Sequence, residues 1–378
     1  MSLREKIERE IRERGPIPFS RYMEMCLYDP ELGYYSKPAE RFGKAGDFYT
    51  SSDVHAVFGR LLARQFEEMW RALDTPESLD LRELGPGRGL FAQDVLDWSE
   101  KKFPEFFRAL RYTLVESSPG LRERLRSTLS RHIESGQAVV LEAGSQARAE
   151  GGLPTIVLAN EFFDALPVEV ISEKGALRIG IHEDRFIETW APASGEELAF
   201  LDRYGVHPEG GGRTEVGLAA VRQMSQIAAS IERGFLIAID YGYTREEQLA
   251  GRHLDTVMTY REHAAGPNPC EAPGEQDITA HVNFSVLAAA AERGGMQAHK
   301  LLTQSQFLIG IGEGNQFADA FEECRLPQER AKVALQLKHL VTPAGMGETF
   351  QVLVASKRVE ASRVEGLSGL GFDREARR

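Results

Sequence analysis

Glycine recurs at every second position within Glu83-Leu84-Gly85-Pro86-Gly87-Arg88-Gly89, and this feature restricts the fold more than any other. An apolar stretch that begins at Leu79 precedes the glycines, and a helical pattern follows over residues 90–96. Because glycine has no Cβ, the backbone there can bend sharply, approach a ligand closely and open a helix whose free N–H groups face a pocket. The succession of strand, glycine turn and helix therefore predicts an α/β fold with a nucleotide-type pocket.

The glycine spacing and the acid before it favour S-adenosylmethionine (SAM) over a dinucleotide as the ligand. A dinucleotide pattern has its third glycine at position 90, which is leucine here. A carboxylate at the strand end also suits the ammonium and sulfonium groups of SAM better than a pyrophosphate. We therefore predict that SAM contacts Glu83, Gly85, Pro86, Gly87 and Gly89. The alternative is a plain strand-to-helix turn without a ligand.

A second predicted strand, residues 111–116, also ends in an acid. In α/β nucleotide folds an acid at this place holds the ribose hydroxyls, so Glu116 and the adjacent Ser117 are predicted cofactor contacts. The alternative is that Glu116 is a surface acid at a helix start, because Ser117-Ser118-Pro119 is also suited to cap a helix.

The fourth predicted strand, residues 155–159, is followed by the polar and aromatic stretch Asn160-Glu161-Phe162-Phe163-Asp164. Ligands bind at the carboxyl ends of the strands in open α/β sheets. We therefore predict that Asn160 and Glu161 contact the cofactor, and that Glu161 and Asp164 are catalytic. A helix cap formed by Asn160 or Asp164 is the alternative.

Three further residues are candidates for catalysis. Asp240 lies in the predicted fifth strand, residues 235–243, while Asp277 and His281 are four residues apart. This spacing brings the two side chains together if the stretch is helical, whereas Asp277 is equally suited to cap the helix that follows. Both readings stay open on the sequence.

The composition restricts the class of partner. The chain of 378 residues has 57 acidic and 45 basic residues and a formal net charge of −12. This balance disfavours a nucleic acid held through its phosphates and favours a basic protein partner. The three cysteines and the scattered histidines have no paired spacing, so we expect neither disulfides nor a metal site. With no secretory signal, transit-peptide pattern or membrane-spanning stretch in the sequence, we expect a cytoplasmic protein.

The order of elements predicts a Rossmann-like, seven-stranded α/β sheet with an N-terminal helical and loop extension and an inserted β-rich subdomain. Helices are expected at 3–14, 19–27, 54–73, 214–232 and 328–340, and short inserted strands at 168–171, 177–181 and 185–190. The aromatic loop after residue 27 either folds over the pocket as a lid or is simply packed. The expected segments are 1–55 with this loop, 56–167, the insertion and return helix 168–230, 231–357, and a polar, disordered tail 358–378. We expect the insertion to be a platform for the substrate.

The ordered series of motifs resembles the MidA-like family of SAM-dependent methyltransferases. The matching motifs are Leu27-Tyr28-Asp29-Pro30, Gly33-Tyr34-Tyr35, Gly46-Asp47-Phe48, Glu83 to Gly89, Val115-Glu116-Ser117-Ser118-Pro119, Asn160 to Pro167, Asp277 to Val282 and Met346-Gly347-Glu348. The chain differs from the family pattern at Ser52-Asp53-Val54-His55, Leu90, Val168-Glu169 and Asn283.

The resemblance implies a bacterial relative of a mitochondrial protein arginine methyltransferase needed for respiratory complex I assembly. It therefore implies methyl transfer from SAM to an arginine of a partner protein, such as a respiratory NADH dehydrogenase subunit. A guanidinium stays protonated in water, so such a site needs carboxylates to orient it and remove a proton. The alternatives are a non-catalytic SAM-binding assembly factor, a methyltransferase of a small molecule or RNA, and a nicotinamide-dependent oxidoreductase.

Overall fold

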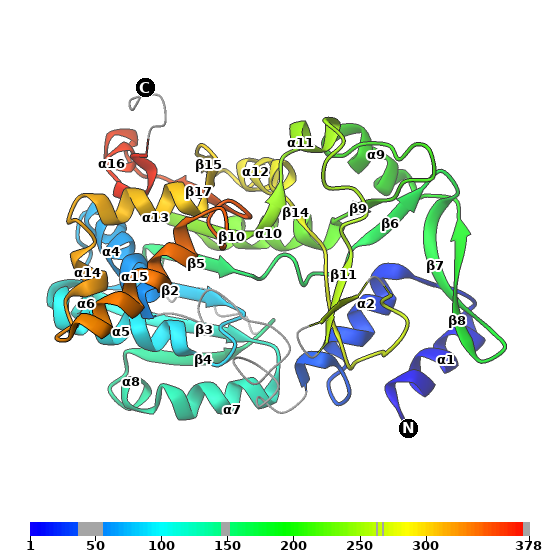
Figure 1. Cartoon of the computed structure of the whole chain (residues 1–378), viewed down its shortest axis with the longest axis horizontal. Coiled ribbons are helices and arrows are strands. Elements are labelled where there is room, and N and C mark those ends of the chain that lie inside the picture. Colours follow the sequence, from blue (N-terminus) through cyan, green and yellow to red (C-terminus); the bar gives the residue numbers. More distant parts are fainter. Residues whose placement is uncertain (37–55, 145–151, 262–263, 267, 373–378) are drawn as a thin grey trace.

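A mixed β-sheet forms the centre of the protein (Figure 1). The structure is a computed structural model that describes residues 1–36, 56–144, 152–261, 264–266 and 268–372. The sheet follows the order β15-β17-β10-β5-β2-β3-β4, and β14 and β16 pair off this path. Its strands are β2 (Leu79–Leu84), β3 (Leu110–Glu116), β4 (Ala138–Glu142), β5 (Thr155–Asn160), β10 (Gly234–Tyr243), β14 (Val282–Asn283), β15 (Gln297–Ala298), β16 (Leu302–Thr303) and β17 (Phe350–Lys357).

The long strands agree with the expected α/β sheet, but the strand number does not. Strands β2, β3, β4, β5 and β10 pair in parallel, and β17 runs antiparallel beside β10. The sequence predicts all six long strands, including β4 from residues 138–141 and β17 from residues 350–355. The sheet has nine strands rather than seven, because β14, β15 and β16 have two residues each and leave no periodic pattern in the sequence.

Helices cover both faces of this sheet. Apart from α1, α2, α9 and α16, which are described below, the α-helices of the described residues are α4 (Ala56–Ala72), α5 (Leu90–Lys102), α6 (Pro104–Ala109), α7 (Pro119–Thr128), α8 (Ser130–Glu134), α10 (Leu218–Ser230), α11 (Arg245–Leu249), α12 (Phe284–Arg293), α13 (Gln304–Glu313), α14 (Ala318–Phe321) and α15 (Pro327–Val341). α4, α5 and α13 share one apolar core with the sheet, and α10 and α12 share a second core with its other face. α4 forms because Val57, Leu61 and Trp70 recur at helical spacing and bury one side.

A second, five-stranded sheet combines one strand of the N-terminal segment with four strands of the insertion (Figure 1). Its strands are β1 (Ile17–Pro18), β6 (Glu169–Ser172), β7 (Gly175–His182), β8 (Arg185–Ala191) and β9 (Thr214–Val216). Ile17 pairs with Ile179, so the N-terminal segment is a strand of the inserted sheet. Helices α1 (Leu3–Arg14) and α2 (Phe19–Tyr28) share an apolar core with β6 and β7. The expected segments 1–55 and 168–230 therefore both contribute residues to one apolar core.

The insertion contains elements that the sequence patterns missed. Helix α9 (Gly195–Tyr204) begins at a capping box, in which the Ser194 hydroxyl accepts the N–H of Glu197. The expected return helix starts at Leu218 and not at 214, because Thr214–Val216 pairs with β6 as strand β9. Tertiary pairing overrides the local helical pattern there.

The stretch around Asp277 is neither helical nor a helix cap. It forms β13 (Asp277–Thr279) in a three-stranded sheet with β11 (Met258–Arg261) and β12 (Ala264–Gly266). The following helix, α12, is capped by Asn283, whose side-chain oxygen accepts the N–H of Val286. Asp277 and His281 are therefore not a pair on one helix, and Asp277 does not cap α12. Both alternatives from the sequence are wrong.

The polar tail is ordered up to residue 372. It forms α16 (Ala361–Glu365) and the 3₁₀ turn η3 (Ser368–Leu370), with Val364 and Leu367 buried. The N–H of Gly369 donates to Oε1 of Gln65 at 2.9 Å, which fastens the turn to α4. Disorder from residue 358 was expected from polarity alone, so this expectation is wrong for residues 358–372; residues 373–378 lie outside the described chain. None of the described helices is long and apolar enough to cross a membrane.

Candidate active site

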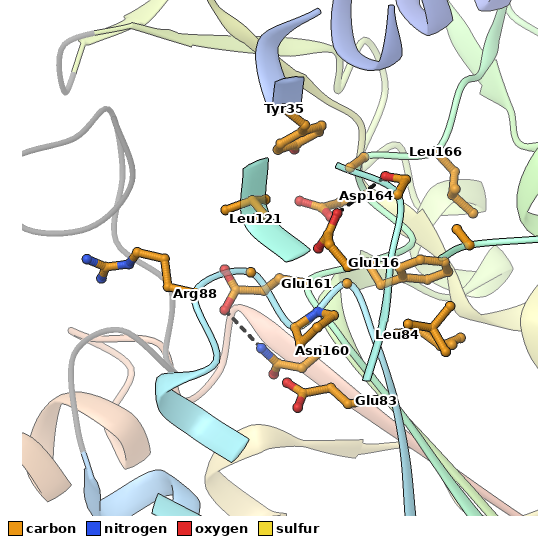
Figure 2. Close-up of a pocket in the computed structure, with 18 of the residues that line it drawn as sticks. Tyr35, Glu83, Leu84, Arg88, Glu116, Leu121, Asn160, Glu161, Asp164 and Leu166 are labelled. Carbon is orange, nitrogen blue, oxygen red and sulfur yellow. Dashed lines mark hydrogen bonds between the residues drawn. The ribbon is translucent and has the colours of Figure 1, made fainter. Parts of the chain in front are cut away.

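A cavity of about 430 Å³ opens at the carboxyl ends of β2, β3 and β5 (Figure 2). Its volume lies within the range of about 300–1,000 Å³ that is usual for small-molecule sites. The glycine turn and the ends of the three strands line one part, and Tyr28, Tyr35 and Asp277 line another. In Figure 2, Glu83 lies at the bottom of the view with Asn160 and then Glu161 above it, and Tyr35 lies near the top.

The glycine turn uses the backbone freedom of all three glycines. Gly85, Gly87 and Gly89 have φ values of +65°, +55° and +79°, which side chains with a Cβ rarely adopt. A Cβ on Gly85 would stand 3.3 Å from the Phe162 ring, and one on Gly89 would stand 2.6 Å from a methyl group of Leu125. Among the described residues, no atom outside Gly87 and its two chain neighbours lies within 4 Å of the Cβ position at Gly87. Gly87 lines the cavity, as does Pro86 between the glycines. The turn therefore leaves room at its centre.

Glu83 is a buried carboxylate at the end of β2. Its side chain lines the cavity, and Oε2 accepts a hydrogen bond of 2.9 Å from the hydroxyl of Tyr112 on β3. Burial raises the pKa of Glu83 to about 8; the Tyr112 hydrogen bond opposes this rise, and the charge of Glu116 adds to it. A cationic ligand in the cavity would favour the ionised form.

Glu116 ends β3, as predicted, and is buried beside the cavity. Its Oε1 accepts the N–H of Ser118 at 2.8 Å and the hydroxyl of Ser117 at 3.4 Å. Ser118 caps α7, so the capping group and the acid are different residues. Burial raises the pKa of Glu116, and its hydrogen bonds to Ser118 and Ser117 oppose the rise. The surface-acid alternative is wrong, since Glu116 is only 5% exposed.

The turn after β5 brings Asn160, Glu161 and Asp164 to the cavity. Glu161 has a φ of +49°, an uncommon conformation for a residue with a side chain. The amide of Asn160 donates to Oε1 of Glu161 at 3.3 Å. Burial, and then the charge of Glu161, raise the pKa of Asp164 to about 7. Oδ1 of Asp164 is buried and has no hydrogen-bond partner within the described chain.

Asp240 does not line the cavity, although the sequence suggested that it is catalytic. Its side chain is completely buried at the carboxyl end of β10 and faces the backbone of residues 162–164. Burial, and then the charges of Asp164 and Glu161, raise its pKa. The structure gives no support to direct contact between Asp240 and a substrate, because neighbouring N–H groups enclose its carboxylate.

His281 also lies outside the cavity lining. Its Nδ1 is 3.1 Å from Nδ1 of His253, and its ring stacks against Tyr241. Burial and then the nearby His253 lower the pKa of His281 to about 4. A direct catalytic role for His281 is therefore not supported, and only Asp277 of the predicted pair reaches the cavity.

The wall opposite the glycine turn comes from the N-terminal extension and β13. The hydroxyl of Tyr28 donates to the carbonyl of Ala165 at 3.0 Å, and that of Tyr35 donates to Oδ1 of Asp277 at 2.9 Å. Both tyrosines lie in the stretch that was expected to be an aromatic loop, which either covers the pocket or only packs; in the structure Tyr28 is the last residue of α2. They line the cavity, while residues 37–55 of the loop lie outside the described chain.

Sequence reasoning missed several lining residues and misjudged the insertion. Arg88 of the glycine turn and Gln223 and Gln226 of α10 line the cavity. Arg88 was within the recognised motif, but nothing in the helical pattern of α10 marks its two glutamines. No described residue of the segment 168–212 is part of the lining, so the expected substrate platform is not at the cavity. The described residues also contain no cluster of three or more His, Cys, Asp or Glu that could hold a metal ion.

Comparisons with known proteins identify the family. The model of a family described as "putative S-adenosyl-L-methionine-dependent methyltransferase" matches residues 61–302. The chain belongs to this methyltransferase family. The predicted resemblance to MidA-like methyltransferases is thereby confirmed.

Curated relatives extend the similarity over most of the chain. The mitochondrial protein arginine methyltransferase NDUFAF7 of Danio rerio is 30% identical over 93% of this chain and 86% of its own length. The mitochondrial NDUFAF7 homolog of Drosophila melanogaster is 29% identical over 98% of this chain and 88% of its own. The Homo sapiens protein is 29% identical over 94% of this chain and 84% of its own.

A solved structure identifies the cofactor. The crystal structure of a superfamily member from Burkholderia thailandensis, bound to S-adenosyl-homocysteine, is 30% identical to this methyltransferase, with a TM-score of 0.83. It covers 100% of this chain, and the match covers 96% of that one. S-adenosyl-homocysteine is SAM without its transferable methyl group. The predicted cofactor and α/β methyltransferase fold are therefore confirmed: this is a SAM-dependent methyltransferase.

Proposed function

We propose that this methyltransferase transfers the methyl group of SAM to an arginine side chain of a partner protein. The names of the curated relatives support this substrate class, because they are protein arginine methyltransferases. The acidic side chains of the cavity support it independently. The two lines of support are separate, since the first concerns other proteins and the second concerns the chemistry of this cavity.

The observation that carries the proposal is the unpartnered oxygen Oδ1 of Asp164. The residue is 7% exposed and lines the cavity, and Oδ1 has no hydrogen-bond partner in the described part of the chain. A buried polar atom left without a partner costs about 1–3 kcal/mol, so this oxygen favours a ligand that donates a hydrogen bond. A guanidinium has only N–H donors, in a planar arrangement that matches carboxylates.

The surroundings of Asp164 suit a planar cation. Glu161 and Asp277 add two further acidic groups to the cavity lining. Tyr28 and Tyr35 add aromatic faces, and burial, followed by the charge of Asp277, raises the pKa of both hydroxyls, so they stay neutral. Aromatic faces attract cations, and carboxylates fix their orientation. We therefore assign acceptor binding to this part of the cavity.

The other part of the cavity fits SAM. Glu83 is a buried acid available to an ammonium or sulfonium group, and the turn through Gly85, Pro86, Gly87 and Gly89 leaves open room at Gly87. We assign the ribose hydroxyls to Glu116 and Ser117. Asn160 has a buried side-chain oxygen without a partner in the described residues, which suits a donor from the cofactor, and Glu161 lies beside it. SAM supplies a methyl group on a positively charged sulfur.

The protein's part in the reaction is to orient the acceptor and remove its proton. The nitrogen–methyl bond forms as the sulfur–methyl bond breaks, and the acceptor nitrogen must lose one proton for the guanidinium charge to be kept. Oδ1 of Asp164 is the group that we assign to accept this proton, with Glu161 orienting the nitrogen. A base whose pKa is about 7 suits this step, because it is partly ionised at neutral pH.

The partner that we propose is a basic region of a respiratory NADH dehydrogenase subunit, as the family resemblance implies. The net charge of −12 favours a basic protein surface. The identity of the partner depends on the family resemblance more than on the cavity. It is therefore tested separately, by labelling the partner with radioactive methyl groups and identifying the labelled protein.

The direct test replaces Glu161 with glutamine. We expect Glu161→Gln to keep SAM affinity within about threefold, because the amide preserves the shape, and to lower methyl transfer to arginine peptides by at least about 100-fold. Glu196→Gln, an exposed glutamate in the first turn of α9, is the matched control and should be unaffected. The measurements are calorimetric SAM titration and transfer of radiolabelled methyl to arginine peptides and to their lysine counterparts.

Two results would overturn the proposal. If the wild-type protein binds SAM and methylates no protein in a bacterial extract, the chain is a SAM-binding assembly factor. If lysine peptides or small amines accept methyl groups as well as arginine peptides do, the acidic cavity does not select a guanidinium. Unchanged turnover in Glu161→Gln would remove Glu161 from the reaction.

A further inference from the structure

The carboxylate of Asp240 is surrounded by the backbone of the turn that carries the predicted catalytic acids. Its Oδ2 accepts the N–H groups of Phe162, Phe163 and Asp164 at 3.2, 2.9 and 3.2 Å. Its Oδ1 accepts the N–H of Tyr241 at 2.9 Å. Four backbone donors thus converge on one fully buried side chain that has no face on the cavity.

This arrangement explains how the turn keeps an unfavourable conformation. Glu161 has a φ of +49°, and its own N–H donates to the carbonyl of Ile239 at 2.9 Å. Three successive N–H groups that point at one oxygen form an anion-binding concavity of the backbone. A left-handed residue costs of the order of 1–3 kcal/mol and persists only where its surroundings determine the conformation. The hydrogen bonds to Asp240 are such surroundings.

We propose that Asp240 is a positioning residue, whose carboxylate holds the turn of residues 161–164 and so orients Glu161 and Asp164 toward the acceptor. The inference rests on the proposed function for the roles of those two acids, but its structural half stands alone. Asp240 acts only through the turn, because its own oxygens are occupied by backbone donors. The groups that face it are Glu161 and Asp164 on the turn and the adjacent Tyr241.

The same turn also reaches the cofactor side of the cavity. The ring of Phe162 lies 3.3 Å from the position of a Cβ on Gly85, within the glycine turn. Because Asp240 holds the N–H of Phe162, one buried carboxylate fixes both the acids and the ring beside the glycine turn. A shift of the turn by about 1 Å is enough to lower a transfer rate by about 100-fold.

The first experiment measures structure and not activity. In Asp240→Asn, one oxygen becomes an NH₂ group that opposes a backbone N–H, so we expect the amides of residues 162–164 to exchange hydrogen at least about tenfold faster than in the wild type. Asp319→Asn is the matched control, because Asp319 is equally buried and pairs with Arg64 far from the cavity. The control should leave exchange at 162–164 unchanged.

The second experiment measures transfer by the same two variants. We expect Asp240→Asn to lower kcat by about 100-fold, with the KM for the arginine peptide and the affinity for SAM changed by less than about threefold. A residue that only stabilises the fold would lower stability without separating kcat from KM in this way.

The outcomes separate this inference from the proposed function. Fast exchange at 162–164 with unchanged kcat overturns the positioning role, and slow exchange in Asp240→Asn overturns the hydrogen-bonding half. If the wild-type protein methylates no arginine, the proposed function fails, and the exchange measurement still decides whether Asp240 holds the turn. If Asp240→Asn does not fold, exchange in the wild type decides: amides 162–164 that exchange as fast as the exposed turn at Gly210–Gly211 would overturn the inference.

Discussion

The two sides of the cavity are built in different ways. Most of the cofactor side consists of the glycine turn and the ends of β2 and β3, within residues 83–117, and Asn160 at the end of β5 adds to it. The acceptor side joins Tyr28 and Tyr35 of the N-terminal extension to Asp277 of β13 and to the turn after β5. One side is local in the sequence, whereas the other exists only after distant segments have come together.

Their buried acids differ in the same way. Glu83, on the cofactor side, already receives a hydrogen bond from Tyr112 of the neighbouring strand. Oδ1 of Asp164, on the acceptor side, lacks a partner in the described residues. The comparison indicates that Glu83 has a hydrogen-bond partner before any ligand arrives, whereas Oδ1 of Asp164 gains one only from a ligand. Variants on each side should therefore separate SAM binding from methyl transfer.

The largest expected effect is the loss of SAM binding in Gly87→Val. Valine is strained at a φ of +55°, and its side chain would occupy the room at the centre of the glycine turn. We expect SAM affinity to fall by at least about 100-fold, as measured by calorimetric titration. Gly251→Val is the control, because Gly251 has a φ of +79° with equally open surroundings and is not part of the cavity lining. Comparable losses of SAM affinity in both variants would mean that general strain, and not the pocket, is responsible.

On the acceptor side, Asp164→Asn should remove transfer and spare cofactor binding. The amide cannot accept the proton from the acceptor, so we expect kcat to fall by about 100-fold or more, with SAM affinity within about threefold. Kinetics with radiolabelled SAM measure kcat, and calorimetry measures the affinity for SAM. A large loss of SAM affinity would contradict the division of the cavity into two sides.

SAM affinity should depend on pH through Glu83. Its pKa is raised to about 8 by burial, so the carboxyl is protonated at lower pH, and a cationic ligand must displace the proton. Affinity should therefore rise as the pH increases toward 8, by at most about tenfold per pH unit, and then level off. Titration in two buffers of different ionisation enthalpy measures the released proton. Glu83→Gln should bind SAM more weakly and with no such slope; a slope retained in the variant would assign the proton to another group.

The same shift affects the stability of the protein without SAM. Because the folded-state pKa of Glu83 lies above its ordinary value of 4.5, the acid stabilises the fold fully below pH 4.5, and this contribution is lost as the pH rises through about 8. The melting temperature of the wild type should fall, relative to that of Glu83→Gln, over this pH range. Parallel melting curves for the two proteins would contradict the buried position of Glu83.

The smallest expected effect is that of Tyr35→Phe. It removes the hydroxyl that donates to Asp277 and leaves the aromatic face in place. Loss of one such hydrogen bond is worth about 0.5–1.5 kcal/mol, so we expect the KM for arginine peptides to change by about tenfold or less and SAM affinity to be unchanged. Steady-state kinetics with peptides of one sequence, bearing arginine or lysine, measure this. An effect on SAM affinity would mean that the two sides are coupled.

The residues that the sequence proposed for the cofactor side all line the cavity, because their signals are local. The glycine spacing, Glu83 and Glu116 each follow from one strand and the turn after it, so no distant contact is needed to recognise them. The same is true of the turn after β5, which was correctly expected at the carboxyl edge of the sheet. Apolar runs also predicted the six long strands, since each is long enough to form such a run.

The acceptor side was predicted only in part because its geometry is tertiary. Asp277 reaches the cavity from a strand, although its spacing to His281 suggested a helix. Asp240 occupies a strand end like the other acids, yet it faces backbone N–H groups, and no sequence pattern distinguishes the two environments. The pairing of Ile17 with Ile179 likewise leaves no local signal, so the shared core of the extension and the insertion could not be predicted.

The position of β17 in the sheet has a consequence for how the chain is made. This strand lies between β10 and the short edge strand β15, although it comes last in the sequence among the described strands. Until residues 350–357 have left the ribosome, most backbone N–H and C=O groups on one edge of the apolar strand β10 have no partner strand. Unpaired strand edges are sites where chains associate wrongly. A nascent chain that stalls before this point would therefore be prone to aggregate, even though every strand that lines the methyl-transfer cavity has already been made.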